Sequence, residues 1–406
     1  MTSSPTTTQD RRILISPRRA SRGFWLVASV YTLAMAGGTL PIPLYPFWAP
    51  QMGFGPFTTT LIFAIYALGV VVALMAFASL SDHTGRRPMM LAAVAVIAIS
   101  TVLFLLAMDV PMLLVARFLF GLATGVLAAT ATAALSELAG TEGSGRASAI
   151  STAASMGGLG LGAMTAGILA RWAADPTHLV FWIYLALLVP ALLAIIVVPE
   201  TVVVRRRPVL TLRRPTLPTA SGRGAFIRSA ALVFAAFAVT GLFSSLVPSF
   251  LRSRLHIDDI AVIAGVVSLL FLVAMTAQLI ISPRWSLRRW LAPVFLLSGV
   301  PAFEAGLLVS SLPLFVVGTI LAGVGIGLAF RRGITVTQEL ATPSRRADLL
   351  ATFFLAAYAG NIIPTIALGV LAQAIGLDVA TGILAIVIVG TTIAAAATGR
   401  RRPARP

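Results

Sequence analysis

A long run of residues without charge is the feature of this sequence that most restricts its fold. From Gly23 to Ser81 the chain contains no Asp, Glu, Lys, Arg or His. One membrane-spanning helix needs about 20 apolar residues, so this stretch holds two spans and their connection. Only 11% of all residues are charged, whereas soluble proteins carry about 25%. The sequence therefore excludes a soluble globular enzyme.

Apolar segments separated by Arg-rich or Pro- and Gly-rich breaks predict twelve spans. The expected fold class is therefore an all-α integral membrane protein with twelve transmembrane helices. Their expected ranges are 23–43, 57–80, 89–108, 112–136, 148–170, 178–198, 228–250, 260–281, 291–310, 313–333, 349–372 and 377–398.

The distribution of arginine predicts the orientation of these spans. All 30 basic residues are Arg, and a cytoplasmic N-terminus puts 26 of them on cytoplasmic segments and three on outer loops, with Arg117 inside a span. The positive-inside rule therefore places both termini in the cytoplasm of a plasma membrane, and the exclusive use of Arg suggests a bacterial inner membrane. Because these arginines lie in short gaps between apolar segments, nucleic acid is not an expected partner, despite the formal charge of +17.

The two halves of the sequence repeat at an offset of 202 residues. Matching segments at this offset include Leu44-Tyr-Pro46 with Leu246-Val-Pro248, Arg86-Arg87 with Arg288-Arg289, Gly121-x-x-x-Gly125 with Gly323-x-x-x-Gly327, Glu137-Leu-Ala139 with Glu339-Leu-Ala341, and Gly167-Ile-Leu-Ala170 with Gly369-Val-Leu-Ala372. Five matches at one offset indicate two six-helix halves related by a pseudo-two-fold axis along the membrane normal. Two such halves that rock about a central site provide alternating access, which indicates a secondary transporter.

The repeat also predicts how the chain is divided. The expected parts are an N-terminal tail 1–22, an N-terminal half 23–198, a linker 199–227, a C-terminal half 228–398 and a C-terminal tail 399–406. Both tails and the linker are expected in the cytoplasm.

The loop between the second and third expected spans carries a recognisable motif. It reads Ala78-Ser-Leu-Ser-Asp82-His-Thr-Gly85-Arg86-Arg87. This segment resembles the G-x-x-x-D-R-x-G-R-R motif of the major facilitator superfamily, with Ala78 in place of the first Gly and His83 in place of the first Arg. A short loop needs Gly for its tight turn, and its Arg pair anchors it at the cytoplasmic face.

The resemblance implies that this loop forms a latch between the two halves. The latch residues would be Asp82, Gly85, Arg86 and Arg87. In the family the Asp lies near the start of span 11 in one conformation, where this sequence offers Arg345 and Arg346 to attract it and Asp348 to oppose it. The alternative is that Arg86 and Arg87 only set the topology.

The fourth expected span contains an arginine inside the membrane. Its segment Arg117-Phe-Leu-Phe-Gly121-Leu-Ala-Thr-Gly125 is similar to the R-x-x-x-G pattern of span 4 in the drug:proton antiporters of the superfamily. An intramembrane Arg costs about 2.5–3.5 kcal/mol and must find a partner. The resemblance implies that Arg117 couples proton movement to substrate; the alternative is an Arg that snorkels to the outer end of its helix.

Glycines in spans 4 and 5 are expected to bring helices close together. The segment Gly158-Leu-Gly-Leu-Gly162-Ala-Met-Thr-Ala-Gly167 resembles the glycine-rich motif of antiporter span 5, although Ala163 replaces its Pro. Small residues at this spacing allow close helix contact. Gly121, Gly125, Gly158, Gly162 and Gly167 are therefore assigned to helix packing.

Few polar residues are available for a substrate path or a proton site. In the superfamily, spans 1, 4, 7 and 10 line the cavity, whereas spans 3, 6, 9 and 12 lie outside it. The path candidates, each of which also fits plain helix packing, are Tyr31, Tyr66, Gln278, Tyr358 and Asn361. Glu304, in span 9, is the acidic residue that lies well inside a span, and it joins Arg117 as a candidate for proton coupling; the alternative is a peripheral carboxyl near the outer interface. The apolar surroundings favour an amphipathic solute.

These features predict an exporter of a small amphipathic compound that exchanges it for protons. Span 1 lacks the carboxylate that many drug:proton antiporters carry, which leaves open an exporter or facilitator of a sugar or another metabolite without proton coupling. The short tails and linker oppose a receptor or scaffold. A membrane enzyme is disfavoured because the three His lie in different loops and there is no Cys. The expected partners are the substrate, protons and the lipid bilayer, and we expect a monomer without cofactor or metal.

Overall fold

The computed structural model describes residues 16–77, 80–140, 143–202, 215–282, 288–342 and 345–397, without the side chains of Asp82, Ser144, Arg346 and Ala347. Within these ranges the regular elements are all helices, and twelve helical segments are long and apolar enough to cross a membrane. The prediction of twelve spans in an all-α membrane protein is confirmed. The tails 1–15 and 398–406 and linker residues 203–214 lie outside the described residues.

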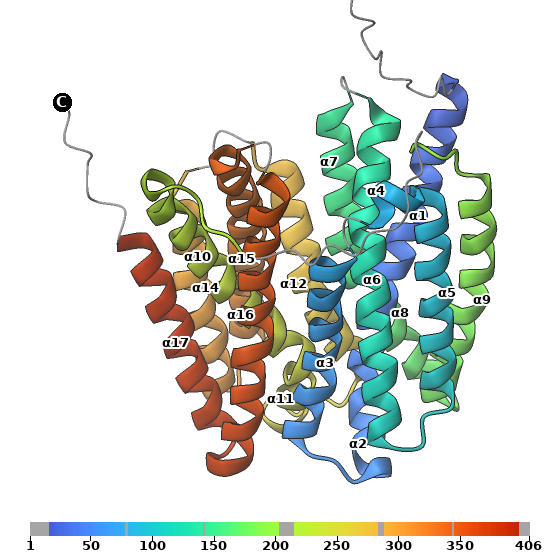
Figure 1. The fold of residues 1–406 in the computed structure, drawn as a ribbon. Coiled ribbons are helices and arrows are strands. Elements are labelled where there is room, and N and C mark those ends of the chain that lie inside the picture. Colours follow the sequence, from blue (N-terminus) through green and yellow to red (C-terminus); the bar gives the residue numbers. More distant parts are fainter. Residues whose placement is uncertain are drawn as a thin grey trace, which may run out of the picture.

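The N-terminal half contains the first six spans (Figure 1). Its helices are α1 (Pro17–Thr39), η1 (Ile42–Leu44), α2 (Tyr45–Met52), α3 (Pro56–Ala76), α4 (Leu80–Thr84), α5 (Arg86–Leu105), α6 (Val110–Ala139), α7 (Ser144–Thr152), η2 (Ala153–Gly157), α8 (Gly158–Trp172) and α9 (Pro176–Val197). The first span is longer than the expected range 23–43, because α1, η1 and α2 follow one another through residue 52.

The C-terminal half contains the other six spans. Its helices are α10 (Ala220–Ser245), α11 (Val247–Ser253), α12 (Ile260–Ile280), α14 (Leu291–Leu308), α15 (Leu312–Leu340), α16 (Arg346–Ile375) and α17 (Leu377–Ala397). Helix α10 begins inside the range expected for the linker. The start of α1 and the end of α17 lie at the same end of the bundle, which we call the termini side (Figure 1).

Several helices on the opposite side begin at an aspartate that caps the first turn. Asp109 accepts a hydrogen bond from the backbone N–H of Met112 at 2.9 Å, and Asp259 accepts one from Ala261 at 2.9 Å. Asp175 caps α9 in the same way. A carboxylate at this position satisfies backbone donors that have no partner in the first turn. These caps explain why α6, α9 and α12 start where they do after short polar turns.

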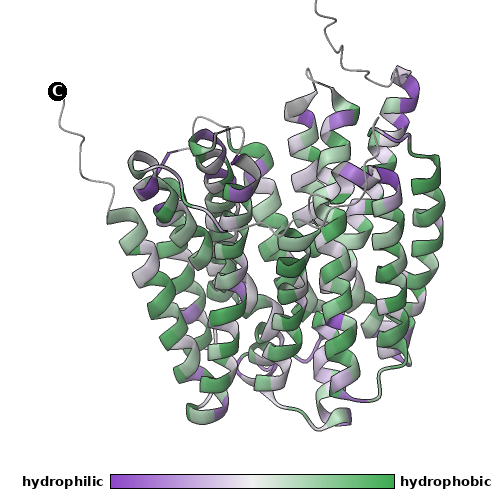
Figure 2. Cartoon of the chain, in the orientation of Figure 1, coloured by the Kyte–Doolittle hydropathy of each residue, from purple (hydrophilic) through white to green (hydrophobic). Residues whose placement is uncertain are grey.

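The helices differ in how deeply they are buried. In the most apolar window of each span, 72% of the residues of α10 are buried in the protein, but only 28% of those of α17. The protein surface keeps many large apolar side chains exposed, including Val197 at 73% and Ile386 at 73%. Polar residues instead gather toward the ends of the bundle (Figure 2). Such an exposed apolar surface is unfavourable in water and matches a lipid bilayer.

The two halves meet along two pairs of helices. Helix α3 packs against α16, and α8 packs against α12. On the side opposite the termini, Arg171 at the end of α8 forms an ion pair of 2.9 Å with Asp259 at the start of α12. There the Arg252 guanidinium also lies 6.0 Å from the ring centre of Phe47. Contacts of charged side chains therefore join the halves on that side.

Candidate functional site

Arg117 lies on α6 and is completely buried inside the N-terminal half. Its Nη1 donates a hydrogen bond of 2.8 Å to the backbone oxygen of Gly38, and its Nε donates one of 3.0 Å to the hydroxyl of Tyr45. Its Nη2 donates to the same hydroxyl. The side chain thereby joins α6 to the end of α1 and to α2. Because none of it reaches solvent, the snorkelling alternative is wrong.

Aromatic rings surround the charge of this arginine. Its Cζ lies 5.6 Å from the ring centre of Tyr45, 5.5 Å from that of Tyr66 and 5.8 Å from that of Phe104. The faces of aromatic rings attract cations, most strongly where water is excluded. The described residues place no carboxylate in an ion pair with Arg117. Two hydrogen-bond acceptors and three rings thus provide what a counter-ion would otherwise supply.

Arg86, from the expected latch, is engaged inside its own half. Its Nη2 donates to Glu137 of α6 at 2.7 Å, and its Nη1 donates to the hydroxyl of Ser81 at 2.6 Å. Glu137 also accepts a hydrogen bond from Thr201, just beyond α9. Arg86 therefore connects three parts of the N-terminal half, which is more than an arginine that only sets topology requires.

The start of α5 is capped by Glu200, which comes from the end of the sixth span. One carboxylate oxygen accepts from the backbone N–H of Arg86 at 2.9 Å, and the other accepts from that of Arg87 at 3.1 Å. A carboxylate at a helix N-terminus satisfies free donors and offsets the positive end of the helix dipole. Gly85 allows this approach because its φ is +107°, and a Cβ there would lie 2.6 Å from a Glu200 oxygen.

The role of Asp82 as a latch stays a prediction. Asp82 lies on α4, and its side chain is outside the described residues, as is that of Arg346. Arg345 is the N-cap residue of α16 and is exposed. The loop that carries Asp82 is held by the Arg86 and Glu200 contacts, which sets its position within the N-terminal half.

The expected packing glycines lie at three different helix contacts. Gly121 and Gly125 of α6 face Tyr66 and Ala73 of α3, respectively. Gly158 and Gly162 face α1, and Gly167 faces Ala264 of α12 in the other half. At Gly121 a Cβ would overlap the backbone oxygen of Tyr66, so a side chain there would push α3 and α6 apart.

Three of the five substrate-path candidates lie near one another where the halves meet. Tyr31 comes from α1, Tyr66 from α3 and Tyr358 from α16. The Tyr66 hydroxyl lies near Gly38 of α1, and α3 packs against α16. The hydroxyls of Ser155 and Thr132 lie beside that of Tyr31. We call these three tyrosines the tyrosine cluster. Its members come from helices of both halves that lie side by side.

Apolar and aromatic side chains surround the C-terminal part of this cluster. The ring of Tyr358 packs edge-on against Phe237 of α10 with 5.8 Å between centres, and Phe237 packs against Phe330 of α15 at the same distance. Tyr358 also borders a narrow gap between α3 and α16, together with Met75 and Phe354, and this gap has no room for a water molecule. An apolar wall with a few hydroxyl groups is typical of small-molecule sites.

Gln278 and Asn361 have other surroundings. Gln278 is buried, and its side-chain amide donates to the backbone oxygen of Ala274 in its own helix at 3.3 Å. Asn361 donates to the hydroxyl of Thr240 on α10 at 3.1 Å, whereas its Oδ1 is buried without a hydrogen-bond partner. Thr240 of α10 therefore binds the side-chain NH2 group of Asn361, whereas the Oδ1 acceptor of Asn361 has no hydrogen-bond partner.

Glu304 lies on α14, where this helix meets α17. The hydroxyl of Thr381 donates to its Oε1 at 3.1 Å, and its Oε2 is buried without a partner. Arg117 and Glu304 therefore occupy different halves and share no contact in the described part of the chain.

Sequence reasoning did not assign a role to Glu137 or Glu200, and it noted Tyr45 as a polar residue of span 1 without pairing it with Arg117. Glu137 stands out only as part of the repeat, and Pro199-Glu200-Thr201 looks like an ordinary end of a span. Tyr45 lies 72 residues before Arg117. An Arg inside a span requires hydrogen-bond partners or a counter-charge. The polar residues of span 1 were therefore the part of the sequence from which a partner of Arg117 could have been predicted.

Solved structures of other transporters share this architecture. The chain is similar to a bacterial homologue of the human lysosomal transporter Spinster, solved in an inward-facing, unoccupied conformation, with 17% identity, a TM-score of 0.73 and coverage of 95% of this chain and 99% of that one. The human organic anion transporter MFSD10 (TETRAN) matches with 18% identity and a TM-score of 0.67 over 93% of this chain and 99% of that one. A POT family transporter in complex with 5-aminolevulinic acid matches with 14% identity and a TM-score of 0.74 over 93% and 95%. At these identities the likeness concerns the fold.

Sequence comparison gives the family. An uncharacterized transporter of Rickettsia bellii (strain RML369-C) is 28% identical over 103 residues, which cover 25% of this chain and about a quarter (26%) of the relative. The sequence model of the family described as "Major Facilitator Superfamily" matches residues 27–302, which is more than half of the chain. With twelve spans in two halves and the Asp82–Arg87 motif in place, the chain belongs to the major facilitator superfamily of membrane transporters.

Proposed function

We propose that this transporter exports a small amphipathic compound in exchange for protons. The termini side faces the cytoplasm, because most arginines in the described part of the chain lie at that end of the bundle. The protein acts as a monomer in the plasma membrane of a bacterium. The tyrosine cluster is the observation that supports this class of substrate, because it combines aromatic and hydroxyl groups from both halves.

The chemistry of the tyrosine cluster favours an amphipathic compound over a sugar or a phosphate. Tyr31, Tyr66 and Tyr358 offer rings for stacking and hydroxyls for a few hydrogen bonds, and the neighbouring wall contains Phe237 and Met75. A sugar requires many hydrogen bonds, and a phosphate requires basic groups. Arg117 does not meet that second need, because aromatic rings enclose it and its hydrogen bonds go to Gly38 and Tyr45.

Removing the ring of Tyr358 should weaken substrate binding. We expect Tyr358→Ala to raise the KM for export about tenfold, since an aromatic pair contributes about 0.5–1.5 kcal/mol. Tyr358→Phe should keep most of the affinity. The measurement follows a compound panel in energised everted vesicles by the change in lumenal pH. A matched control is Trp182→Ala, because Trp182 is 59% exposed on the outer surface. An unchanged KM in Tyr358→Ala would contradict the proposed site.

Glu304 is the proposed proton-binding group. Its carboxyl is buried, has one oxygen without a partner, and can gain or lose a proton without breaking the Thr381 hydrogen bond. We expect Glu304→Gln to abolish substrate-driven proton release from energised vesicles, while uptake of a labelled substrate down its gradient continues. Asp258→Asn, which changes an exposed carboxylate, should leave both processes intact.

The same experiment distinguishes proton antiport from the alternative function. If no compound releases protons from wild-type vesicles but a labelled metabolite enters down its gradient, the protein is a facilitator without proton coupling. The absence of an acidic partner for Arg117 among the described residues favours this alternative. Normal proton release in Glu304→Gln would instead keep antiport and move the proton site elsewhere.

A further inference from the structure

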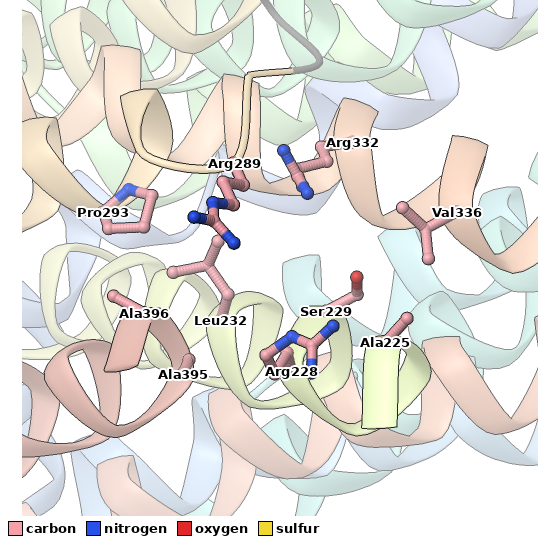
Figure 3. A pocket seen from close by; sticks show the side chains of 10 residues that line it. All are labelled: Ala225, Arg228, Ser229, Leu232, Arg289, Pro293, Arg332, Val336, Ala395 and Ala396. Carbon is pink, nitrogen blue, oxygen red and sulfur yellow. The ribbon is translucent and has the colours of Figure 1, made fainter. Parts of the chain in front are cut away.

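A cavity with three arginines lies at the termini side of the C-terminal half, away from the tyrosine cluster. Its volume is about 70 Å³, and it is bordered by Arg228 of α10, Arg289 and Pro293 near the start of α14, Arg332 of α15 and Ala395 of α17. The three guanidinium groups face a common space (Figure 3). We call this cavity the arginine pocket.

The internal repeat provides a comparison within the same molecule. At the offset of 202 residues, Arg289 corresponds to Arg87, but Arg228 corresponds to Leu26 and Arg332 to Thr130. In the N-terminal half these positions are packed: Leu26 lies against the apolar core, and Thr130 is buried with its hydroxyl donating to the backbone of its own helix at 2.8 Å. Two of the three arginines are therefore specific to the C-terminal half, and the repeat does not explain them.

The arginine pocket brings three positively charged groups together. Arg332 is repelled by Arg228 and Arg289 and attracted by Glu339, which is itself exposed. Three guanidinium groups that converge on one cavity favour an anion, and guanidinium matches the geometry of a phosphate group.

The surroundings of the pocket point to a lipid as the source of that phosphate. Leu232, Pro293 and Ala395 give the pocket apolar borders beside the arginines. The neighbouring side chains Trp290, Val294 and Ile393 are about half exposed, at 47%, 50% and 51%. Trp is enriched at membrane interfaces, and apolar side chains at this depth face lipid. The pocket therefore joins a basic site to the lipid-facing surface at one leaflet.

We propose that the arginine pocket binds the head group of an anionic phospholipid from the leaflet on the termini side. The phosphate sits among Arg228, Arg289 and Arg332, and the glycerol and acyl chains continue along the apolar border toward Val294. Basic pockets between membrane helices bind such head groups. This inference requires only the fold, and it holds whatever the transported compound is.

The test measures lipid retention on the purified full chain. Native mass spectrometry in detergent with added phosphatidylglycerol should show one retained lipid, and phosphatidylcholine should be retained at least tenfold less well. Arg228→Gln/Arg332→Gln should weaken phosphatidylglycerol binding roughly 30-fold, because each arginine near a membrane surface contributes about a fivefold factor. Arg289→Gln alone should weaken phosphatidylglycerol binding about fivefold. Because the Arg289 side chain is exposed, this substitution should leave folding intact.

The control removes the same charge elsewhere. Arg22 and Arg223 are exposed on α1 and α10 and do not border the pocket, so Arg22→Gln/Arg223→Gln should retain the lipid like the wild type. Equal retention of both lipids by the wild type, or equal losses in the two double variants, would overturn the proposal. Full displacement of the lipid by millimolar inorganic phosphate would overturn it as well, because the site would then belong to a soluble anion.

Discussion

Arg117→Ala is expected to abolish transport while the protein still inserts into the membrane. The substitution removes the donors to the Gly38 oxygen and the Tyr45 hydroxyl, which would remain buried without partners. Each such group costs about 1–3 kcal/mol, and the emptied space among three rings adds a cavity penalty. The link from α6 to α1 and α2 would be lost, although the apolar spans that drive insertion are untouched. Substrate-dependent pH change in everted vesicles, set against the amount of protein in the membrane, measures both effects.

A second substitution separates the charge of Arg117 from its packing. Arg117→Met keeps a side chain of comparable reach without the hydrogen bonds or the charge, so a purely space-filling role predicts near-normal transport in this variant. We expect it to be inactive as well. Arg18→Ala, which removes an exposed arginine from the start of α1, should transport normally. Transport at the wild-type rate by Arg117→Ala would contradict any coupling role for this residue.

The features of the fold that depend on composition and period were predictable from the sequence. Apolar length and the charge-free stretch from Gly23 to Ser81 define spans, because a bilayer imposes one length scale on every helix. The repeat and the loop motif from Asp82 to Arg87 then indicate the family. Helix ends were less accurate, since α10 starts at Ala220 and α1 at Pro17, where charged residues extend the helices beyond the apolar core.

The contacts of individual polar residues were not predictable in the same way. The hydrogen-bond partners of Arg117 come from α1 and α2, and Glu200, which caps the N-terminus of α5, follows the end of α9. Both sets of contacts therefore depend on how helices that are distant in sequence pack. The sequence predicted the same role, a place in the substrate path, for Asn361 and Gln278. In the structure one reaches a neighbouring helix, and the other bonds to its own backbone. Periodicity gives the face of a helix, but not which neighbour that face meets.

Gly85→Ala is expected to destabilise the N-terminal half strongly. Gly85 has a φ of +107° and a ψ of 152°, a conformation that residues with a Cβ rarely adopt. A Cβ would also lie 2.6 Å from Oε2 of Glu200, the carboxylate that caps α5 through the backbone N–H groups of Arg86 and Arg87. Backbone strain of this kind costs about 1–3 kcal/mol, and loss of the cap adds about 0.5–2 kcal/mol. We expect the purified variant to unfold several degrees below the wild type and transport to fall to roughly a tenth.

The variant Gly140→Ala distinguishes the two causes of this destabilisation, which are backbone strain at a positive φ and loss of the Glu200 cap. Gly140 ends α6 with a φ of +69°, but a Cβ there would meet nothing within 4 Å. It should therefore show the cost of the backbone conformation without any displacement of a carboxylate, and its thermal shift should be clearly smaller than that of Gly85→Ala. Glu200→Gln, which keeps the shape of the side chain but removes its charge, should reproduce part of the Gly85→Ala effect. Equal shifts for Gly85→Ala and Gly140→Ala, together with a neutral Glu200→Gln, would mean that backbone strain alone matters and that the Glu200 cap contributes little to holding the loop that carries Asp82.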